Sequence, residues 1–163
     1  MPHGNGGILM RLLVVSDIHG REEKLERVLD AQPTARTVFF LGDGLRETQT
    51  VADRHPERTF FCVPGNCDLA VGLPAAGLEL CGGRRIFYTH GHRYGVKGGL
   101  TALSLAAAER QAQIVLFGHT HVPYECYEDG VWYMNPGSLG YDDRYGYVDL
   151  VGDGVLTNVV RLR

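Results

Sequence analysis

Short apolar runs alternate with amphipathic stretches through the first half of the chain. Residues 11–15 (RLLVV), 37–41 (TVFFL) and 59–63 (TFFCV) are rich in branched and aromatic side chains, as is typical of strands. Between them lie residues 22–31, whose apolar positions share one helical face, and residues 45–55, a weaker helical pattern. This order predicts parallel strands joined by right-handed helical crossovers.

The second half of the chain changes to paired strands with glycine-containing turns between them. An alanine-rich helix is predicted over 99–112 and a further buried strand within 114–119. Three β-hairpin turns are predicted, at Gly82-Gly83, Asp129-Gly130 and Asp153-Gly154. Together the two halves predict an α/β fold in which two sheets pack face to face with helices outside.

Composition narrows the class of protein. The 163 residues, 44% hydrophobic and 21% charged, suffice for one globular domain, expected over 10–163 behind a loose leader of residues 1–9. The net charge of -3 argues against nucleic acid as a partner, beyond a nucleotide substrate, because non-specific binding requires a basic surface. No apolar run is long enough to cross a membrane and no signal peptide is recognisable. We therefore expect a cytoplasmic protein with four reduced cysteines, and no feature predicts its oligomeric state.

Side chains that can bind metal ions follow five of the predicted strands. Ligands in open α/β sheets bind beyond the carboxyl ends of strands, so these side chains are expected to meet at one edge. They are Asp17, His19, Asp43, Asn66, Cys67, Asp68, His90, His92, His119 and His121. Each motif alone is ambiguous, since a Gly-Asp-Gly is often only a turn. Five of the seven histidines lie in these positions, and such crowding favours a bound cation; His3 and His55 are read as surface residues.

The donor types indicate the kind of metal site. Mixed oxygen and nitrogen donors suit Mn, Fe, Zn, Co or Ni better than Ca or Mg. The cysteine spacings do not form the thiolate set of a structural zinc site. Seven candidate ligands exceed the need of one ion, which favours two ions that share a carboxylate. Such ions lie about 3.5–4 Å apart and stabilise both the attacking and the leaving oxygen of an in-line displacement.

Five motifs occur in order along the chain, namely SDIHG (16–20), LGDG (41–44), PGNCD (64–68), THGH (89–92) and FGHTH (117–121). In this order they resemble the calcineurin-like metallophosphoesterase superfamily, over nearly the whole chain from Met10. The short chain, the GNCD motif and the later NPGS segment (135–138) are similar to the small bacterial and archaeal phosphodiesterase group. The retromer subunit that keeps this fold as a protein-binding scaffold belongs to the same branch.

The resemblance implies a four-layer αββα sandwich of two mixed β-sheets flanked by helices. It also implies two divalent metal ions, with Mn²⁺ expected first and Fe, Zn, Ni or Co as alternatives. The implied ligands are Asp17, His19 and His121 for the first ion, Asn66, His90 and His119 for the second, and Asp43 as the bridge. The implied reaction is attack on phosphorus by a metal-bridging hydroxide, without a covalent enzyme intermediate.

One position departs from the family pattern. Many members have histidine where this chain has Cys67, and that histidine pairs with the next acidic residue, here Asp68, to protonate the leaving oxygen. A thiol is a weak hydrogen-bond donor, so we expect a preference for phosphodiesters or for esters with acidic leaving groups. The alternative is that Cys67 only packs beneath the metal ions.

Other residues beside the motifs are candidates for catalysis or substrate binding. Asp68 and His92 are the catalytic candidates; Asp68 is also expected to orient its neighbours, and His92 is equally compatible with orienting a ligand or with no role. The candidates for substrate binding are Cys67, Gly91 and Arg144.

Turn residues complete the predicted site. Gly65, Gly91 and Gly118 are expected to let the backbone bend sharply beside the ligands. Tyr141 and Arg144 lie in the segment 135–147, which is either a surface loop, the reading that we favour, or a wall of the substrate groove.

Three functions follow from the motifs. The first is a binuclear metal-dependent phosphodiesterase acting on a phosphate-ester substrate. The second is a phosphomonoesterase or nucleotide pyrophosphatase with a small-molecule substrate. No cap domain or long insertion defines a narrow pocket, so the sequence does not indicate the physiological substrate. The third is a protein-binding scaffold with a vestigial metal site, which seven intact ligand positions disfavour because a scaffold does not need them.

Overall fold

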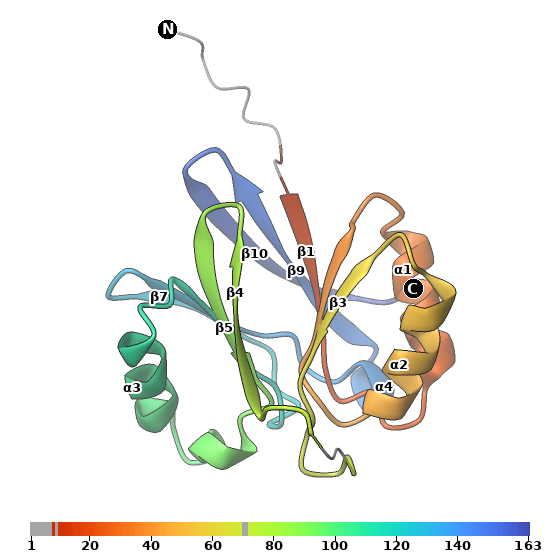
Figure 1. Ribbon diagram of the computed structural model, residues 1–163, viewed down its shortest axis with the longest axis horizontal. Coiled ribbons are helices and arrows are strands. Elements are labelled where there is room, and N and C mark those ends of the chain that lie inside the picture. The colour runs from red at the N-terminus through yellow and green to blue at the C-terminus, as the bar shows by residue number, and fades with distance from the viewer. Residues whose placement is uncertain (1–7, 9, 70–71) are drawn as a thin grey trace, which may run out of the picture.

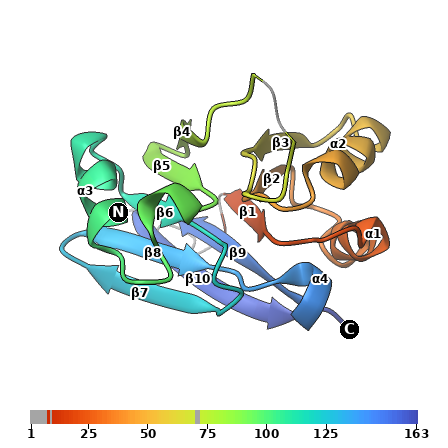
Figure 2. The same cartoon turned by 90° about the horizontal axis from the view of Figure 1, so that it is seen from below.

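The computed structural model describes residues 8, 10–69 and 72–163 of the chain. Its core is a pair of five-stranded sheets that face each other, with helices on the outer side of each sheet (Figure 1). The same layers are seen after rotation by 90° (Figure 2). The predicted four-layer αββα sandwich is therefore confirmed, whereas the expected leader of residues 1–9 falls, apart from Ile8, outside the described residues.

The first sheet has the strand order β10-β9-β1-β2-β3. β1 (Met10–Val15), β2 (Thr37–Phe40) and β3 (Thr59–Cys62) run parallel, as the strand–helix alternation predicts. β9 (Arg144–Val151) pairs antiparallel with β1, and β10 (Gly154–Arg161) continues the sheet as an antiparallel edge strand. The sheet is therefore mixed.

The second sheet has the strand order β4-β5-β6-β8-β7. β5 (Arg84–Thr89), β6 (Ile114–Leu116) and β8 (Val131–Asn135) run parallel in its centre. β4 (Ala76–Cys81) and β7 (Tyr124–Glu128) form its antiparallel edges. Each edge strand is joined to its neighbour by one of the predicted hairpins.

Helices cover the outer faces of both sheets. α1 (Glu22–Ala31), α2 (Leu45–Arg54) and the four-residue α4 (Leu139–Asp142) lie on the first sheet, and α3 (Thr101–Glu109) lies on the second (Figure 1). α4 and a 3-10 turn at His92–Tyr94 are not predicted by the hydrophobic pattern. Among the described residues, no helix combines the length and the apolar character needed to cross a membrane.

The alternation of side chains along β1 explains why its sequence is continuously apolar. Leu12 and Val14 point between the sheets, into a core that they share with strands of the second sheet. Leu13 and Val15 point the other way and pack with α1 and α2. Both faces of the strand are thus removed from water, which is the situation that a wholly apolar run predicts.

The hairpin turns follow the glycine positions, with one difference in register. Gly82 and Gly83 have φ values of 55° and 80°, as type I′ turns require. In the third hairpin Val151 pairs with Gly154, so the turn is formed by residues 152–153, one residue earlier than predicted. Gly152 takes the positive φ of 54° that the first turn position needs, which leaves Gly154 free to start β10.

Candidate metal centre

The loops that follow β1, β2, β3, β5 and β6 meet at one end of the two sheets. Parallel strands place their carboxyl ends on the same edge, so five separate loops deliver side chains to one region. The structure brings together all seven residues predicted as metal ligands: Asp17, His19, Asp43, Asn66, His90, His119 and His121.

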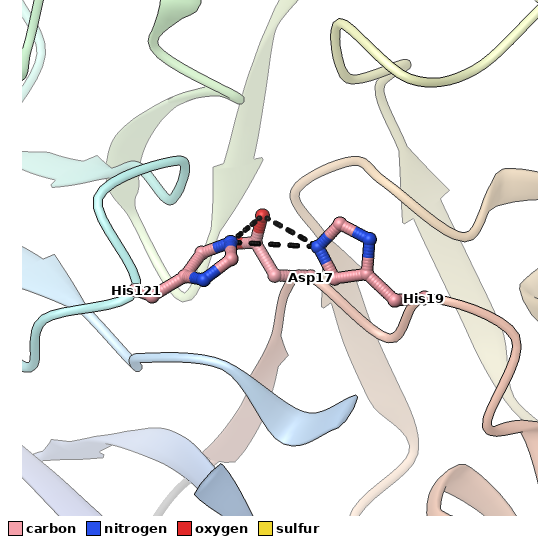
Figure 3. Close-up of side chains that lie close together, drawn as sticks. All are labelled: Asp17, His19 and His121. Atoms are coloured by element: carbon pink, nitrogen blue, oxygen red, sulfur yellow. Dashed lines mark hydrogen bonds and ion pairs between the residues drawn. The ribbon is translucent and has the colours of Figure 1, made fainter. Parts of the chain in front are cut away.

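Asp17, His19 and His121 form the first group of candidate ligands, which we call the first group (Figure 3). The Nε2 atoms of His121 and His19 lie 3.2 Å and 3.7 Å from Asp17 Oδ1, and they lie 3.4 Å from each other. Asp17 is fully buried, whereas both histidine rings are partly exposed. Three atoms that can act as metal ligands therefore converge on a space that opens to solvent.

Asn66, His90 and His119 form the second group. Nε2 of His90 lies 3.0 Å from Asn66 Oδ1 and 3.1 Å from His119 Nδ1. The other ring nitrogen of His90, Nδ1, lies 2.7 Å from the Leu41 carbonyl oxygen and donates to it. Because that bond holds the proton of a neutral ring at Nδ1, the Nε2 lone pair faces the second group, as in histidines that bind metals.

Asp43 lies between the two groups. Its Oδ2 is 3.4 Å from Nε2 of His90 and 3.9 Å from Nε2 of His19, so one carboxylate oxygen faces a member of each group. Its Oδ1 accepts the N–H of Cys67 at 2.9 Å, which fixes the orientation of the carboxylate. This is the placement that a bridging ligand needs.

The electrostatic environment favours an ionised Asp43. Burial alone raises the pKa of Asp43, but His90 and the Cys67 N–H outweigh burial and hold this pKa well below its usual range. Burial alone lowers the pKa of His90, yet Asp43 and Asp17 raise it overall, so this position attracts positive charge. The pKa of His119 is lowered by burial and by its neighbour His90. An ionised carboxylate and a neutral imidazole are the forms that bind metal ions.

The donor set fits a divalent cation. Asp17 Oδ2 accepts the Ser16 hydroxyl at 2.6 Å and the His119 N–H at 3.2 Å, whereas the buried Oδ1 has no hydrogen-bond partner within the described part of the chain. A carboxylate oxygen is costly to bury without a partner, and this one points at imidazole nitrogens of the first group. A cation bound between them satisfies all of these lone pairs at once.

Strained backbone conformations concentrate at these ligands. Eight non-glycine residues of the described chain have positive φ, a region that side chains with a Cβ rarely adopt. Five of the eight are candidate ligands: Asp17, His19, Asp43, His119 and His121. Strain of this kind costs of order 1–3 kcal/mol per residue and collects at functional sites.

Glycines allow the ligand loops to approach closely. Of the three glycines at which a sharp bend is predicted, only one has the positive φ that favours glycine. Gly91 has a φ of 106°, as expected, but Gly65 and Gly118 lie outside the positive-φ region. A Cβ on Gly65 would overlap the carboxylate and main chain of Asp43, and one on Gly118 would overlap the side chain of Ser16. These two glycines are therefore needed for space, a cause that local sequence does not show.

Asp68 holds two loops together. Its Oδ2 accepts the N–H groups of Asp43 and Gly65, both at 2.8 Å. Its Oδ1 accepts the N–H groups of Gly44 and Leu45, at 3.0 and 3.1 Å, where α2 begins. With both oxygens occupied by main-chain donors, this environment favours the orienting role expected for Asp68 over its role as a catalytic candidate.

Cys67 and His92 lie beside the ligands. Cys67 is exposed and lines a cavity of about 510 Å³ together with His19, Asp43 and Arg46; burial and the nearby Asp43 raise the pKa of its thiol. The ring of His92 lies 5.3 Å from that of His90, and its buried Nδ1 has no partner in the described chain. The pKa of His92 is lowered, by burial and then by His90.

Arg144 is engaged elsewhere. Its Nε lies 3.2 Å from Asp142 Oδ2, and it is not among the residues that line the cavity beside Cys67. The arginine of that cavity is Arg46, at the start of α2, which the sequence analysis does not single out. Arg46 follows the predicted ligand Asp43 by three residues, and this closeness in the sequence could have identified Arg46 as a residue near the site.

The NPGS segment donates hydrogen bonds to the loops that carry the first group. Asn135 and Ser138 are fully buried, so this part of the expected surface loop is core. Asn135 Nδ2 donates to the Gly118 carbonyl at 3.1 Å, and Ser138 Oγ donates to the Asp17 carbonyl at 2.9 Å. The segment thereby ties the loop after β8 to the loops that carry the ligands.

Two facing mixed sheets with carboxylate, amide and imidazole donors at their strand ends are the arrangement of the metallophosphoesterase fold. The chain belongs to the calcineurin-like phosphoesterase superfamily, whose domain model matches residues 10–150. The predicted family is thus confirmed, and the chain carries acidic and histidine groups that could hold the divalent metal ions on which this family depends.

Individual relatives carry two kinds of name. In a gapped alignment of 169 positions, the chain is 31% identical to phosphodiesterase YfcE of Escherichia coli K12. The alignment covers 86% of this chain and 88% of that protein. The chain is 42% identical over 135 residues to vacuolar protein sorting-associated protein 29 of Schizosaccharomyces pombe, covering 79% and 72%. A predicted phosphoesterase from Streptococcus pneumoniae superposes with a TM-score of 0.81 at 28% identity, covering 93% of this chain and 89% of that one.

Proposed function

We propose that this protein is a binuclear metal-dependent phosphodiesterase. The observation that carries the proposal is the meeting of two ligand groups around Asp43, beside a buried Asp17 oxygen that has no hydrogen-bond partner in the described chain. The relative named phosphodiesterase YfcE supports the reaction class.

The ligand roles that we propose follow the two groups. When bound, divalent cations supply a hydroxide nucleophile at neutral pH and offset charge on the phosphoryl oxygens. Asn66 is a neutral ligand, so it adds no charge that repels the substrate. The proposed ligands are Asp17, His19 and His121 for one ion, Asn66, His90 and His119 for the other, and Asp43 for both.

The cavity beside Cys67 supports a preference for diesters. Its volume of about 510 Å³ is sufficient for an organic arm of the substrate, and Arg46 and Glu47 add one charge of each sign to its wall. Its lining offers the weak thiol donor of Cys67 where a proton donor would assist an alkoxide leaving group. Esters with acidic leaving groups need no such assistance, so they are the substrates that we propose.

The test compares an aryl diester, bis(4-nitrophenyl) phosphate, with an alkyl monoester, glycerol phosphate. Metal-free protein is supplied with Mn²⁺, Zn²⁺, Co²⁺, Ni²⁺ or Fe²⁺ in turn, and initial rates are measured for the wild type and Asp43→Asn. We expect Mn²⁺ to support the fastest diester hydrolysis. Asp43→Asn should lose at least about 100-fold in rate, because loss of a partner outside the ligands already costs about 10- to 100-fold and Asp43 is a proposed ligand itself. Faster hydrolysis of the alkyl monoester contradicts the diester preference, and full activity of Asp43→Asn contradicts its bridging role.

A protein-binding scaffold is the second candidate. The relative named for vacuolar protein sorting, 42% identical to this chain, favours it. Absence of hydrolysis with every metal and both esters, combined with normal metal binding, would support the scaffold over the enzyme.

A further inference from the structure

Tyr141 is an exposed aromatic side chain that lies against the first group of ligands. Its ring stacks on the ring of His19, with centroids 4.5 Å apart and planes inclined by 22°. It also lies 5.4 Å from the ring of His121, the second histidine of this group. The side chain is 70% exposed, so burial of Tyr141 itself does not account for this position.

The two histidines that face Asp43 are oriented in different ways. A histidine that binds a metal is usually held by a hydrogen bond from its second ring nitrogen, and His90 has such a bond to Leu41. In the described chain, the ring of His19 makes its only hydrogen-bond-length contact through Nε2, which faces His121. The stacked ring of Tyr141 lies where it can limit rotation of the His19 ring about its plane.

Tyr141 is itself held rigidly against the loop that carries Asp17 and His19. Ser138 Oγ accepts the Tyr141 N–H at 3.1 Å and donates to the Asp17 carbonyl at 2.9 Å. The N–H of Gly140 donates to the same carbonyl at 3.0 Å, and Lys24 Nζ donates to the Gly140 carbonyl at 2.7 Å.

Gly140 makes this close approach possible. A Cβ at this position would overlap the carbonyl of Ile18, so α4 can lie directly on the ligand loop only with glycine there. The short helix and the ligand loop thus form one unit, which fixes the main chain of Tyr141 beside His19.

We propose that Tyr141 is a positioning residue that sets the metal affinity of the first group. The inference rests on the proposed function only in requiring a metal ion at Asp17, His19 and His121. Loss of a partner outside the ligands usually lowers metal affinity 10- to 100-fold, and stacking on one of three ligands belongs at the lower end of that range, about tenfold.

The test is a calorimetric titration of the metal-free full-length protein with Mn²⁺. Tyr141→Ala and Tyr141→Leu, which lack the ring, should weaken one of two binding events about tenfold and leave the other unchanged. Tyr141→Phe, which keeps the ring, should bind as the wild type does. The matched control is Tyr127→Ala, since Tyr127 is 60% exposed and packs on Trp132 with centroids also 4.5 Å apart. This control should leave both events unchanged.

A second set of variants, made in protein that carries Asn66→Ala, shows which ligand group the weakened metal-binding event belongs to. Asn66→Ala removes a ligand of the second group, and we expect the binding event that remains to show the tenfold loss when Tyr141→Ala is added. Thermal unfolding of each metal-free variant shows whether its fold is intact. Wild-type binding in Tyr141→Ala, equal weakening of both events, or a Phe variant as weak as the Ala variant overturns the proposal.

The calorimetric result tests the role of Tyr141 in metal binding independently of the proposed phosphodiesterase activity, because calorimetry does not depend on turnover. A wild type that binds two ions but hydrolyses no ester contradicts the phosphodiesterase and leaves the role of Tyr141 intact. A wild type that binds no metal ion contradicts both.

Discussion

Replacement of Asp68 by asparagine distinguishes a positioning carboxylate from a catalytic one. The aspartate accepts four main-chain N–H groups, two at each oxygen. Asparagine keeps one oxygen and places an NH₂ group, itself a donor, against the other two N–H groups. The change therefore leaves one pair of N–H donors without an acceptor. The pair is either that of Asp43 and Gly65 or that of Gly44 and Leu45, at the start of α2.

The expected loss of stability follows from these bonds. An unsatisfied buried donor costs about 1–3 kcal/mol, and because Asp68 is only half-buried the lower end applies to each of the two, about 2 kcal/mol in total. For a chain of this length, about 2–4 °C in Tm corresponds to each kcal/mol, so Tm should fall by about 4–8 °C. Asp68→Ala removes all four bonds and should cost about twice as much.

The assay is urea and thermal unfolding of the metal-free protein, with Asp53→Asn as the control. Asp53 is an exposed carboxylate on α2, the helix whose first N–H groups Asp68 accepts, so its variant should unfold as the wild type does. A stable Asp68→Asn variant that binds metal normally but has lost activity would refute the reasoning, because it would make the carboxylate a participant in catalysis.

Three further predictions test single positions. Gly65→Ala should destabilise the metal-free protein by about 1–3 kcal/mol and weaken metal binding, because the new Cβ overlaps Asp43; a calorimetric profile equal to the wild type would contradict this. Arg46→Ala should raise KM for the aryl diester several-fold with little change in kcat, since Arg46 lines the cavity outside the ligand groups; an effect on kcat alone would count against this placement. Cys67→His should raise the rate for alkyl leaving groups at least about tenfold by supplying a general acid, and steady-state assays that show no gain on any poor leaving group would exclude that role.

The sequence was sufficient to predict the layers of the fold because burial leaves a direct trace in composition. Leu12 to Val15 face a second sheet on one side and helices on the other, so their run carries no polar position. The candidate ligands were equally visible, since each follows such a run and parallel strands end at one edge.

What the sequence did not reveal depends on contacts between distant segments. Asp68 and the donors of Gly44 and Leu45 are more than twenty residues apart, and no local pattern encodes their hydrogen bonds. The four-residue α4 is too short for a helical period, so the stacking of Tyr141 on His19 could not be predicted. The space requirement of Gly65 likewise comes from Asp43 in another loop.

We propose that phosphodiester hydrolysis by this protein would depend on two metal ions held by the two ligand groups around Asp43. The most direct measurement adds Mn²⁺ stepwise to metal-free protein and records bound metal per chain and the initial rate of bis(4-nitrophenyl) phosphate hydrolysis in the same samples. Our account predicts two ions per chain, with the rate rising as the second ion binds. Full binding of two ions without turnover, or maximal turnover with one ion per chain, would contradict it.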